Sequence, residues 1–389
     1  MRLGITSKLY ETRMRKKGRL GEVAGVFFKL GCVAFGGPAA HIAMMEAEIV
    51  HKRKWMDHQH FLDLIGATNL IPGPNSTEMT MHCGHERAGV PGLFVAGICF
   101  IFPAVVITGV FAYFYSTYGT LPQVEAFIYG IKPAVLIIIL AAVIKLGKKA
   151  LKSWELGILG TLVLIASLLG INEIVSLLLA GLTGGIYFWL KSQKKGSLQS
   201  VFPFLFLQMT TMSSPFLTTM KIFWTFAKVG AVLYGSGYVL FAYLDAELVT
   251  KGWLSRQQLI DAVAVGQFTP GPVLSTATFI GFQLKGIWGA VAATAGIFLP
   301  SFLFVWILNP LVPKMRKSAI LGYFLDSVNI AAVAVMLAVL IVMSKETLTD
   351  WRGILIALIS IGLTFGLKKP SSVLTVVVGA IAGYLLSLV

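Results

Sequence analysis

Two Pro-Gly-Pro sequences stand beside polar side chains in a chain that is otherwise strongly apolar. The first lies in PGPNSTE (72–78), where three hydrogen-bonding side chains lead to the carboxyl group of Glu78, and the second lies in TPGP (269–272). Gly-rich sequences precede both, as FGGP (35–38) and YGSG (234–237). Proline removes a backbone donor and glycine accepts unusual dihedral angles, so we expect a helix break at all four sequences.

A broken helix exposes free N–H groups at its N-terminus, where anions are favoured. Four breaks that converge near the middle of a membrane would hold a small oxyanion through backbone and hydroxyl hydrogen bonds. Lysines seven residues before the Gly-rich breaks add positive charge about 10 Å away along a continuous helix. A single break would be read as a packing kink, but four at matched positions favour a binding site. The predicted substrate-binding residues are Lys29, Gly36, Gly37, Pro38, Pro72, Gly73, Pro74, Asn75, Ser76, Thr77, Lys228, Gly235, Ser236, Gly237, Gln267, Thr269, Pro270, Gly271 and Pro272.

The elements that position these residues are predicted to be membrane helices. The chain has 389 residues, of which 56% are hydrophobic and 13% charged, with a mean hydropathy of +0.81. Soluble domains have about a quarter charged residues. Apolar stretches of about 20 residues recur along the whole chain, which excludes the alternating pattern of an outer-membrane barrel. The sequence therefore predicts an all-α polytopic membrane protein.

The basic residues indicate membrane orientation rather than nucleic-acid binding. The first twenty residues carry seven Lys/Arg against one Glu and have no apolar core before a cleavage site, so they read as a cytoplasmic tail instead of a signal peptide. The net charge of +15 is spread over short loops, where it contacts lipid headgroups. We expect no nucleic-acid partner.

The chain contains two homologous halves. Residues 46–74 align with 245–272, residues 27–38 with 226–237, and 88–104 with 285–301, at an offset of 197 to 199 throughout. This internal repeat is the pattern of a duplicated membrane domain.

Loop charges predict that the two halves are inverted. A loop that is basic in one half corresponds to a loop without an excess of Lys/Arg in the other half. The positive-inside rule therefore gives the two halves opposite orientations in the membrane. Inverted repeats are typical of secondary transporters. The inversion requires one extra crossing, for which the weakly apolar residues 201–217 are the candidate. The predicted organisation is a tail (1–20), a first transporter repeat (21–195), a linker with a possible transmembrane helix (196–220) and a second, inverted repeat (221–389).

Each half is expected to contain two re-entrant hairpins with tips at the breaks. Residues 59–86 are too polar for one lipid-facing span, and full crossing by residues 22–45 would place Lys52, Arg53 and Lys54 outside. Two full crossings per hairpin give the same parity and remain the alternative.

Proton coupling has four candidate residues. Glu78 lies within one helical turn of its break, and its repeat counterpart is Thr276, so it breaks the symmetry. Intramembrane carboxylates are costly and usually functional. His41, three residues after FGGP, is a proton-sensitive group near the substrate. Glu48 and Glu247 match across the repeats and are gates or structural ion pairs.

We expect no metal, cofactor or catalytic residue. All six histidines lie between positions 41 and 85, but HCGH (82–85) lacks a matching ligand set and the second half has no counterpart. A membrane-embedded enzyme would need an acid–base or ligand constellation, and the HExxH, GxSxG and Walker A patterns are absent from the sequence.

The ordered motifs resemble the chromate ion transporter family, in its long-chain, two-domain form. They are FFKLGCVAFGGPAAHI with the following E-x-E, NLIPGPNSTE and RAG in the first half, and YGSGYV, GWLS, QFTPGP and IFLPSF in the second, so the resemblance runs from about residue 20 to the end of the chain. One departure is Ser236, which stands in YGSG where the family more usually has FGGG.

The resemblance implies a carrier in the inner (plasma) membrane that exports chromate and so gives chromate resistance, driven by the proton or charge gradient. Sulfate would be the isosteric competitor, and a sulfate or other oxyanion transporter of the same fold is the alternative. The sequence does not indicate an oligomeric state.

Overall fold

The protein is helical in every part that the structure describes. The computed structural model describes residues 19–35, 38–68, 71–119, 121–171, 173–193, 218–233, 239–308, 318–367 and 372–388. These ranges contain no strand, and five of their helices are long and apolar enough to cross a membrane. The predicted all-α, multi-pass membrane fold is therefore confirmed. The predicted linking segment 201–217 and the basic tail before residue 19 lie outside the described residues.

The first half begins with a helix over residues 19–33 and ends with the helix over Glu173–Gln193. Polar caps set some of the helix starts; for example, the Ser153 hydroxyl accepts a hydrogen bond from the backbone N–H of Leu156. The elements that follow residue 33 are α2 (Pro38–Glu46), η1 (Ala47–Lys52), α3 (His58–Thr68), α4 (Asn75–Tyr118), α5 (Pro122–Ala150), α6 (Trp154–Leu168) and α7 (Glu173–Gln193).

The second half repeats this order of elements, with one added 3-10 helix, η3, before its long helix. A Ser255–Gln258 capping box starts its second hairpin helix, and Asp350 caps the counterpart of α6. Its elements are α8 (Thr219–Val232), α9 (Leu240–Leu244), η2 (Asp245–Val249), α10 (Arg256–Phe268), η3 (Val273–Ser275), α11 (Thr276–Leu308), α13 (Ala319–Thr347), α14 (Trp351–Gly366) and α15 (Ser372–Ser387).

Irregular backbone recurs at equivalent positions in the two halves. The π-helices η1 and η2 occupy matched positions, and such turns are frequent at functional sites. The long helices α4 and α11 each bend at a glycine with positive φ, 68° at Gly89 and 57° at Gly286. The duplication seen in the sequence is therefore also present in the backbone.

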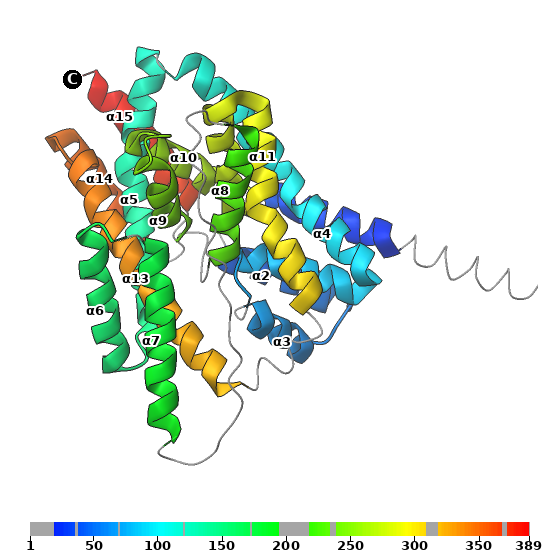
Figure 1. Cartoon of the computed structure of the whole chain (residues 1–389). Coiled ribbons are helices and arrows are strands. Elements are labelled where there is room, and N and C mark those ends of the chain that lie inside the picture. The colour runs from blue at the N-terminus through cyan, green and yellow to red at the C-terminus, as the bar shows by residue number, and fades with distance from the viewer. Residues whose placement is uncertain are drawn as a thin grey trace, which may run out of the picture.

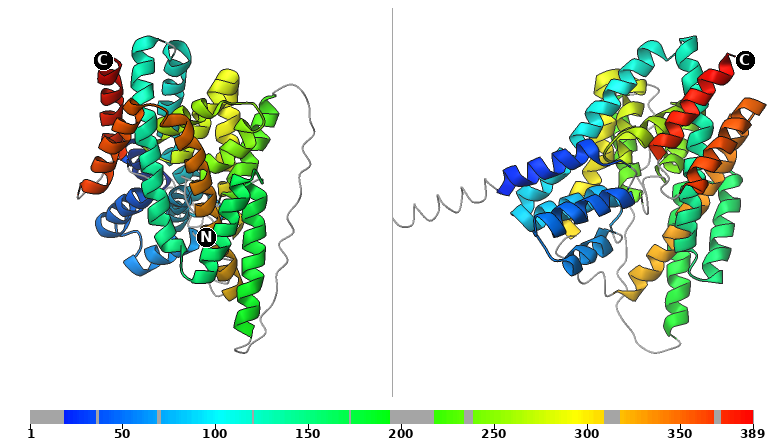
Figure 2. Two further views of the ribbon diagram at one scale, coloured as in Figure 1. Left: turned by 90° about the vertical axis from the view of Figure 1, so that its left-hand side faces the viewer. Right: turned by 180° about the vertical axis from the view of Figure 1, so that it is seen from behind.

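Equivalent helices run in opposite directions and exchange partners. Figure 1 shows α5 descending from the top of the molecule, whereas its counterpart α13 ascends from the bottom. Helix α5 packs against α14 and α15 of the other half, as Figure 2 shows for α5 in teal and α15 in red, and α13 packs against α6 and α7. Helices α5 and α15 approach closely at Gly130, because a Cβ there would collide with the backbone of Gly379 and Gly383.

The helices that flank the breaks are short. Helix α2 continues directly into η1, so the 9 residues of α2 and the 6 residues of η1 together extend about 20 Å, and the 11 residues of α3 extend about 16 Å, whereas a bilayer core needs about 30 Å. The 13 residues of α10 extend about 20 Å. These lengths favour the re-entrant hairpins over two full crossings per hairpin.

Candidate functional site

The breaks of one half meet the breaks of the other half through two backbone hydrogen bonds. The Gly73 N–H donates to the Leu233 carbonyl oxygen at 2.6 Å, and the Gly271 N–H donates to the Ala34 carbonyl oxygen at 2.9 Å. Each Pro-Gly-Pro glycine thus contacts the residue that leads into the Gly-rich break of the opposite half. We call the Gly73–Leu233 contact the first crossing and the Gly271–Ala34 contact the second crossing.

The first crossing is surrounded by buried polar groups that have no partner. The side chains of Thr77, Glu78 and Ser301 are fully buried, and Thr77 Oγ1, both Glu78 carboxylate oxygens and Ser301 Oγ make no hydrogen bond. Gly73, with φ of 145°, is required here, because a Cβ would collide with the Glu78 and Ser301 oxygens. Buried polar atoms are nearly always satisfied, so this cluster is suited to a proton, water or polar ligand.

The second crossing carries no ionisable group at the equivalent positions. Thr276 replaces Glu78, and its hydroxyl donates to the Val273 carbonyl at 2.8 Å. Ala104 replaces Ser301, and its Cβ lies against Gly271. Gln267 is a buried polar residue near this crossing whose Nε2 has no partner, but its amide does not ionise. The asymmetry that the sequence predicts at Glu78 is therefore accompanied by a second asymmetry at Ser301.

His41 connects the hairpin helix α2 to the second crossing. The side chain is buried, its Nε2 lies 3.1 Å from the Ala34 carbonyl oxygen, and its ring contacts Phe100 edge-on. Its Nδ1 makes no hydrogen bond. The same carbonyl accepts from Gly271, so a change at His41 would act directly on the contact between the two halves.

The predicted lysines and glutamates take different partners in the two halves. Lys228 Nζ lies 2.5 Å from a carboxylate oxygen of buried Glu247, and Lys251 contacts the other oxygen at 2.5 Å. In the first half, Glu48 pairs with Lys52 at 3.3 Å and with Arg53 at 2.9 Å, and Lys29 is exposed. Of the two repeat-equivalent pairs, Lys228 and Glu247 thus form an ion pair, whereas Glu48 pairs with Lys52 and Arg53 instead of Lys29.

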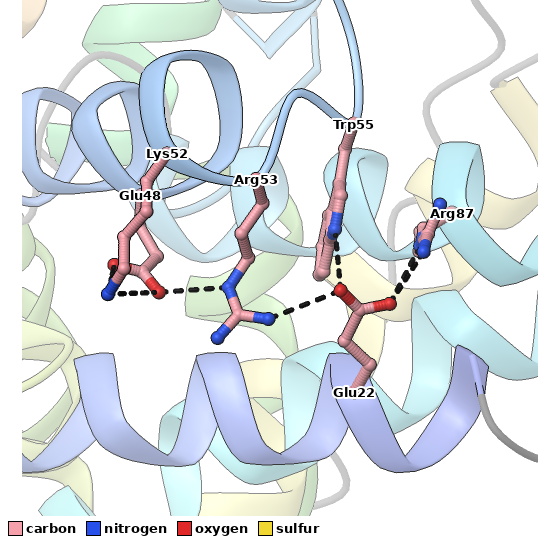
Figure 3. Close-up of polar contacts among 6 residues, drawn as sticks. All are labelled: Glu22, Glu48, Lys52, Arg53, Trp55 and Arg87. Carbon is pink, nitrogen blue, oxygen red and sulfur yellow. Dashed lines mark hydrogen bonds and ion pairs between the residues drawn. The ribbon is translucent and has the colours of Figure 1, made fainter.

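Figure 3 shows a polar network that joins three elements of the first half. Glu22, on the helix over 19–33, accepts hydrogen bonds from Arg53, Trp55 and Arg87 at 2.6 to 3.2 Å. Arg87 also lies over the Trp55 ring at 5.4 Å. Burial alone would raise the pKa of Glu22, but the hydrogen bonds from its basic and indole partners have the larger effect, so its pKa lies below the ordinary value. Hydrogen bonds from Arg53 and Lys52 lower the pKa of Glu48. The network holds the outer ends of both first-half hairpins together.

The remaining predicted site residues divide into those at the crossings and those that are not described. Ser76, Thr269 and the prolines of both Pro-Gly-Pro sequences lie at the helix ends that form the crossings, where Asn75 begins α4. Pro38 begins α2. Gly36, Gly37, Gly235, Ser236 and Gly237 lie outside the described residues.

The clustered histidines other than His41 and His82 lie near acidic or surface positions. His51 and His58 both pair with Glu46, and His60 pairs with Glu86. His85 lies in the first segment of α4.

Two residues near the halves' contact surface are absent from the predicted set. Ser301 follows Pro300, which the repeat alignment matches to Pro103, but the alignment does not show that Ser301 faces Gly73. Lys132 lies inside an apolar span and pairs with buried Asp261 at 3.5 Å. A lysine in the middle of a predicted span is a detectable signal, because such residues are usually functional.

Comparisons with known proteins agree with the duplicated architecture. The family described as "Chromate transporter" matches the chain twice, over residues 21–185 and 220–384. A chromate transport protein of Cupriavidus metallidurans is 30% identical over 94% of this chain and 92% of its own length. A probable chromate transport protein of Synechococcus elongatus is 30% identical over 94% and 95%, and a chromate transport protein of Pseudomonas aeruginosa is 26% identical over 92% and 90%. No solved structure matches the chain.

Proposed function

The chain belongs to the chromate transporter family, and on this premise we propose that it exports chromate, a tetrahedral oxyanion, through the contact between its two halves. The protein would lie in the cytoplasmic membrane, with its N-terminal tail in the cytoplasm and lipid around its apolar helices. Each repeat would contribute one pair of breaks to a single substrate path. Export from the cytoplasm would give the cell chromate resistance.

The observation that carries the proposal is the reciprocal contact of the breaks beside unpartnered buried polar groups. Thr77 Oγ1 and Ser301 Oγ can each donate to an oxyanion, and α4 begins at this point, so the dipole at its N-terminus favours negative charge. Lys29 is exposed and would raise the anion concentration in the approach to the crossings, whereas Lys228 is paired with Glu247.

Glu78 supplies the proposed coupling to the proton gradient. A charged carboxylate would repel a dianion in the same buried space, so substrate binding favours the protonated acid and substrate release favours the ionised one. Proton and dianion would then affect each other's binding through one carboxyl group. His41, Glu48 and Glu247 are the further proposed proton-responsive groups, because His41 lies at the second crossing and the two glutamates each hold basic side chains.

The test is chromate uptake into everted membrane vesicles that contain the protein. We expect uptake above that of vesicles without it, inhibition by sulfate in excess, and loss of accumulation when the proton gradient is collapsed. Uptake of labelled sulfate with no inhibition by chromate would replace chromate by sulfate as the substrate. Absence of uptake of both anions under a full gradient would contradict the proposal.

A further inference from the structure

A buried ion pair inside the membrane region lies outside the two crossings. Lys132 of α5 and Asp261 of α10 are 14% and 5% exposed, and Lys132 Nζ lies 3.5 Å from Asp261 Oδ1. Tyr115 of α4 donates a hydrogen bond from its hydroxyl to Asp261 Oδ2 at 2.7 Å. Three helices that come from both halves therefore meet at one carboxylate.

The cation of this pair is held loosely. Its 3.5 Å separation exceeds the usual 2.7–2.9 Å of a charge-assisted N–H···O bond, and Asp261 Oδ1 makes no hydrogen bond although it is buried. The Lys228–Glu247 pair in the same molecule is closed at 2.5 Å. A buried charge pair with poor geometry regains little of its desolvation cost, so such a pair is weak evidence of a purely structural role.

The pair, which joins the two halves, has no repeat-equivalent pair. At the repeat offset, the counterpart of Lys132 is Asn329 and that of Tyr115 is Val312, whereas Asp261 matches Asp63. A contact needed to build the duplicated fold would be expected in both copies. Lys132 and Tyr115 are thus additions to one copy, as Glu78 and Ser301 are.

A line of contacts along α4 connects the pair to the second crossing. Ala104 lies against Gly271, and Thr108, one turn later, donates to the Ser275 hydroxyl at 3.1 Å. Tyr115 follows after two further turns on the same face, because residues separated by four and seven positions share one side of a helix. Beyond Tyr115, α4 ends at Tyr118, before a loop that has no Lys or Arg.

We propose that Lys132 and Tyr115 form a second, transient oxyanion site between the second crossing and the α4–α5 end of the molecule, in which the anion replaces Asp261. The ammonium group offers three donors and the hydroxyl offers one, which suits a tetrahedral dianion. Asp261 holds both groups when the site is empty and so prevents them from trapping the anion. This inference rests on the proposed function, since it assigns a site on the same substrate path.

The experiment measures anion binding and transport with four variants of the full-length protein. Labelled sulfate and chromate are the probes, binding is measured on protein in nanodiscs, and transport is measured in proteoliposomes. The variants are Asp261→Asn, Lys132→Gln, the double variant Lys132→Gln/Asp261→Asn, and the control Lys145→Gln, which removes an exposed charge from the same helix.

Removing the competing carboxylate should expose the second site. We expect Asp261→Asn to bind a second equivalent of anion and to transport about tenfold more slowly, because the anion leaves Lys132 slowly. Lys132→Gln should bind one equivalent with unchanged affinity and also transport about tenfold more slowly, because the path has lost its cation. The control should match the wild-type protein in both measurements.

The double variant separates this site from a structural ion pair. Replacing both charges by neutral amides leaves no unpaired buried charge, so it remains testable if a single variant fails to fold. Slow transport and one bound equivalent are expected. Transport at the wild-type rate in the double variant, or one bound equivalent in a folded Asp261→Asn, would overturn the inference. If the wild-type protein neither binds nor transports either anion, the proposed function itself fails.

Discussion

The side chain of Glu78 places an acid where an anion is expected to bind. Its carboxylate oxygens, together with the hydroxyls of Thr77 and Ser301, are buried without hydrogen-bond partners at the first crossing. The second crossing has Thr276 and Ala104 in place of Glu78 and Ser301. A buried carboxyl group is thus found at only one of these two equivalent positions, and the proposed proton coupling rests on this asymmetry.

The first prediction concerns Glu78→Gln, which resembles the protonated acid. Because the variant cannot repel a dianion, we expect it to bind chromate or sulfate as tightly as the wild type or more tightly, and to lose transport driven by a pH gradient. Anion counterflow, which needs no net proton movement, should continue. Binding assays and counterflow in proteoliposomes measure these effects. Lost binding with normal pH dependence in the remaining transport would mean that Glu78 is structural.

The second prediction concerns Glu22 and pH. The net pKa of Glu22 lies below its ordinary value of 4.5, so its ionised form stabilises the folded protein at neutral pH. This contribution is present above the unfolded-state pKa and is lost as the pH falls through the folded-state pKa. Glu22→Gln should therefore lower the melting temperature by about 2 °C at pH 7, and this difference should shrink as the pH falls below 4.5 and through the folded-state pKa.

Melting curves at a series of pH values check the Glu22 prediction, with Glu155→Gln as a control. Glu155 pairs with Lys191 outside the Glu22 network, and its pKa is also lowered, so it reports on a single exposed pair. An effect of Glu22→Gln that does not shrink as the pH is lowered from 7 to well below 4.5 would contradict the assigned charge interaction.

The helix breaks that contact each other in the fold lie about 160 residues or more apart in the sequence. The glycine and proline patterns predict where the helices stop, and the repeat predicts that the stops are equivalent. The partners of the breaks are not predictable in this way, because an alignment of the halves matches Gly73 with Gly271 and does not show that Gly73 contacts Leu233. The Lys132–Asp261 pair is missed for the same reason, since it joins helices of different halves.

The third prediction concerns the glycines of the crossings. Gly73→Ala should destabilise the folded state by about 1–3 kcal/mol from backbone strain alone, and it should stop transport because the added methyl collides with Glu78 and Ser301. The matched control is Gly89→Ala. Gly89 also has positive φ, but no atom lies within 4 Å of the added Cβ, so the control carries strain without the collision.

Melting temperature and transport rate together distinguish the two glycine variants. We expect both variants to melt earlier and only Gly73→Ala to lose transport at a temperature where each is folded. Equal transport by the two variants would contradict the assignment of the first crossing to the substrate path.

The loop charges predict how the whole molecule is oriented in the membrane. The positive-inside rule predicts inverted halves, and the opposed directions of α5 and α13 agree with it (Figure 1). The rule gives orientation but not packing. It does not indicate that α5 contacts α14 and α15 while α13 contacts α6 and α7, because those contacts depend on small residues such as Gly130 that also occur elsewhere in the spans.

The fourth prediction is the membrane topology. Reporter fusions should place the N-terminus and residues 145–152 inside, and residues 345–352 and the C-terminus outside. Alkaline phosphatase and fluorescent-protein fusions at the four positions measure this, because each reporter is active on one side of the membrane only. Fusions at 145–152 and 345–352 that report the same side would contradict the inverted arrangement.

The exchange of partners between α5 and α13 bears on how such a chain arose. Helices α6 and α7 pack on α13 rather than remaining with α5 of their own half, so one half alone leaves the α5 surface without the helices that cover it. A second copy inserted the other way up would supply them. We infer that the ancestral gene encoded a single repeat that worked as an antiparallel pair, and that duplication and fusion joined partners which already depended on each other.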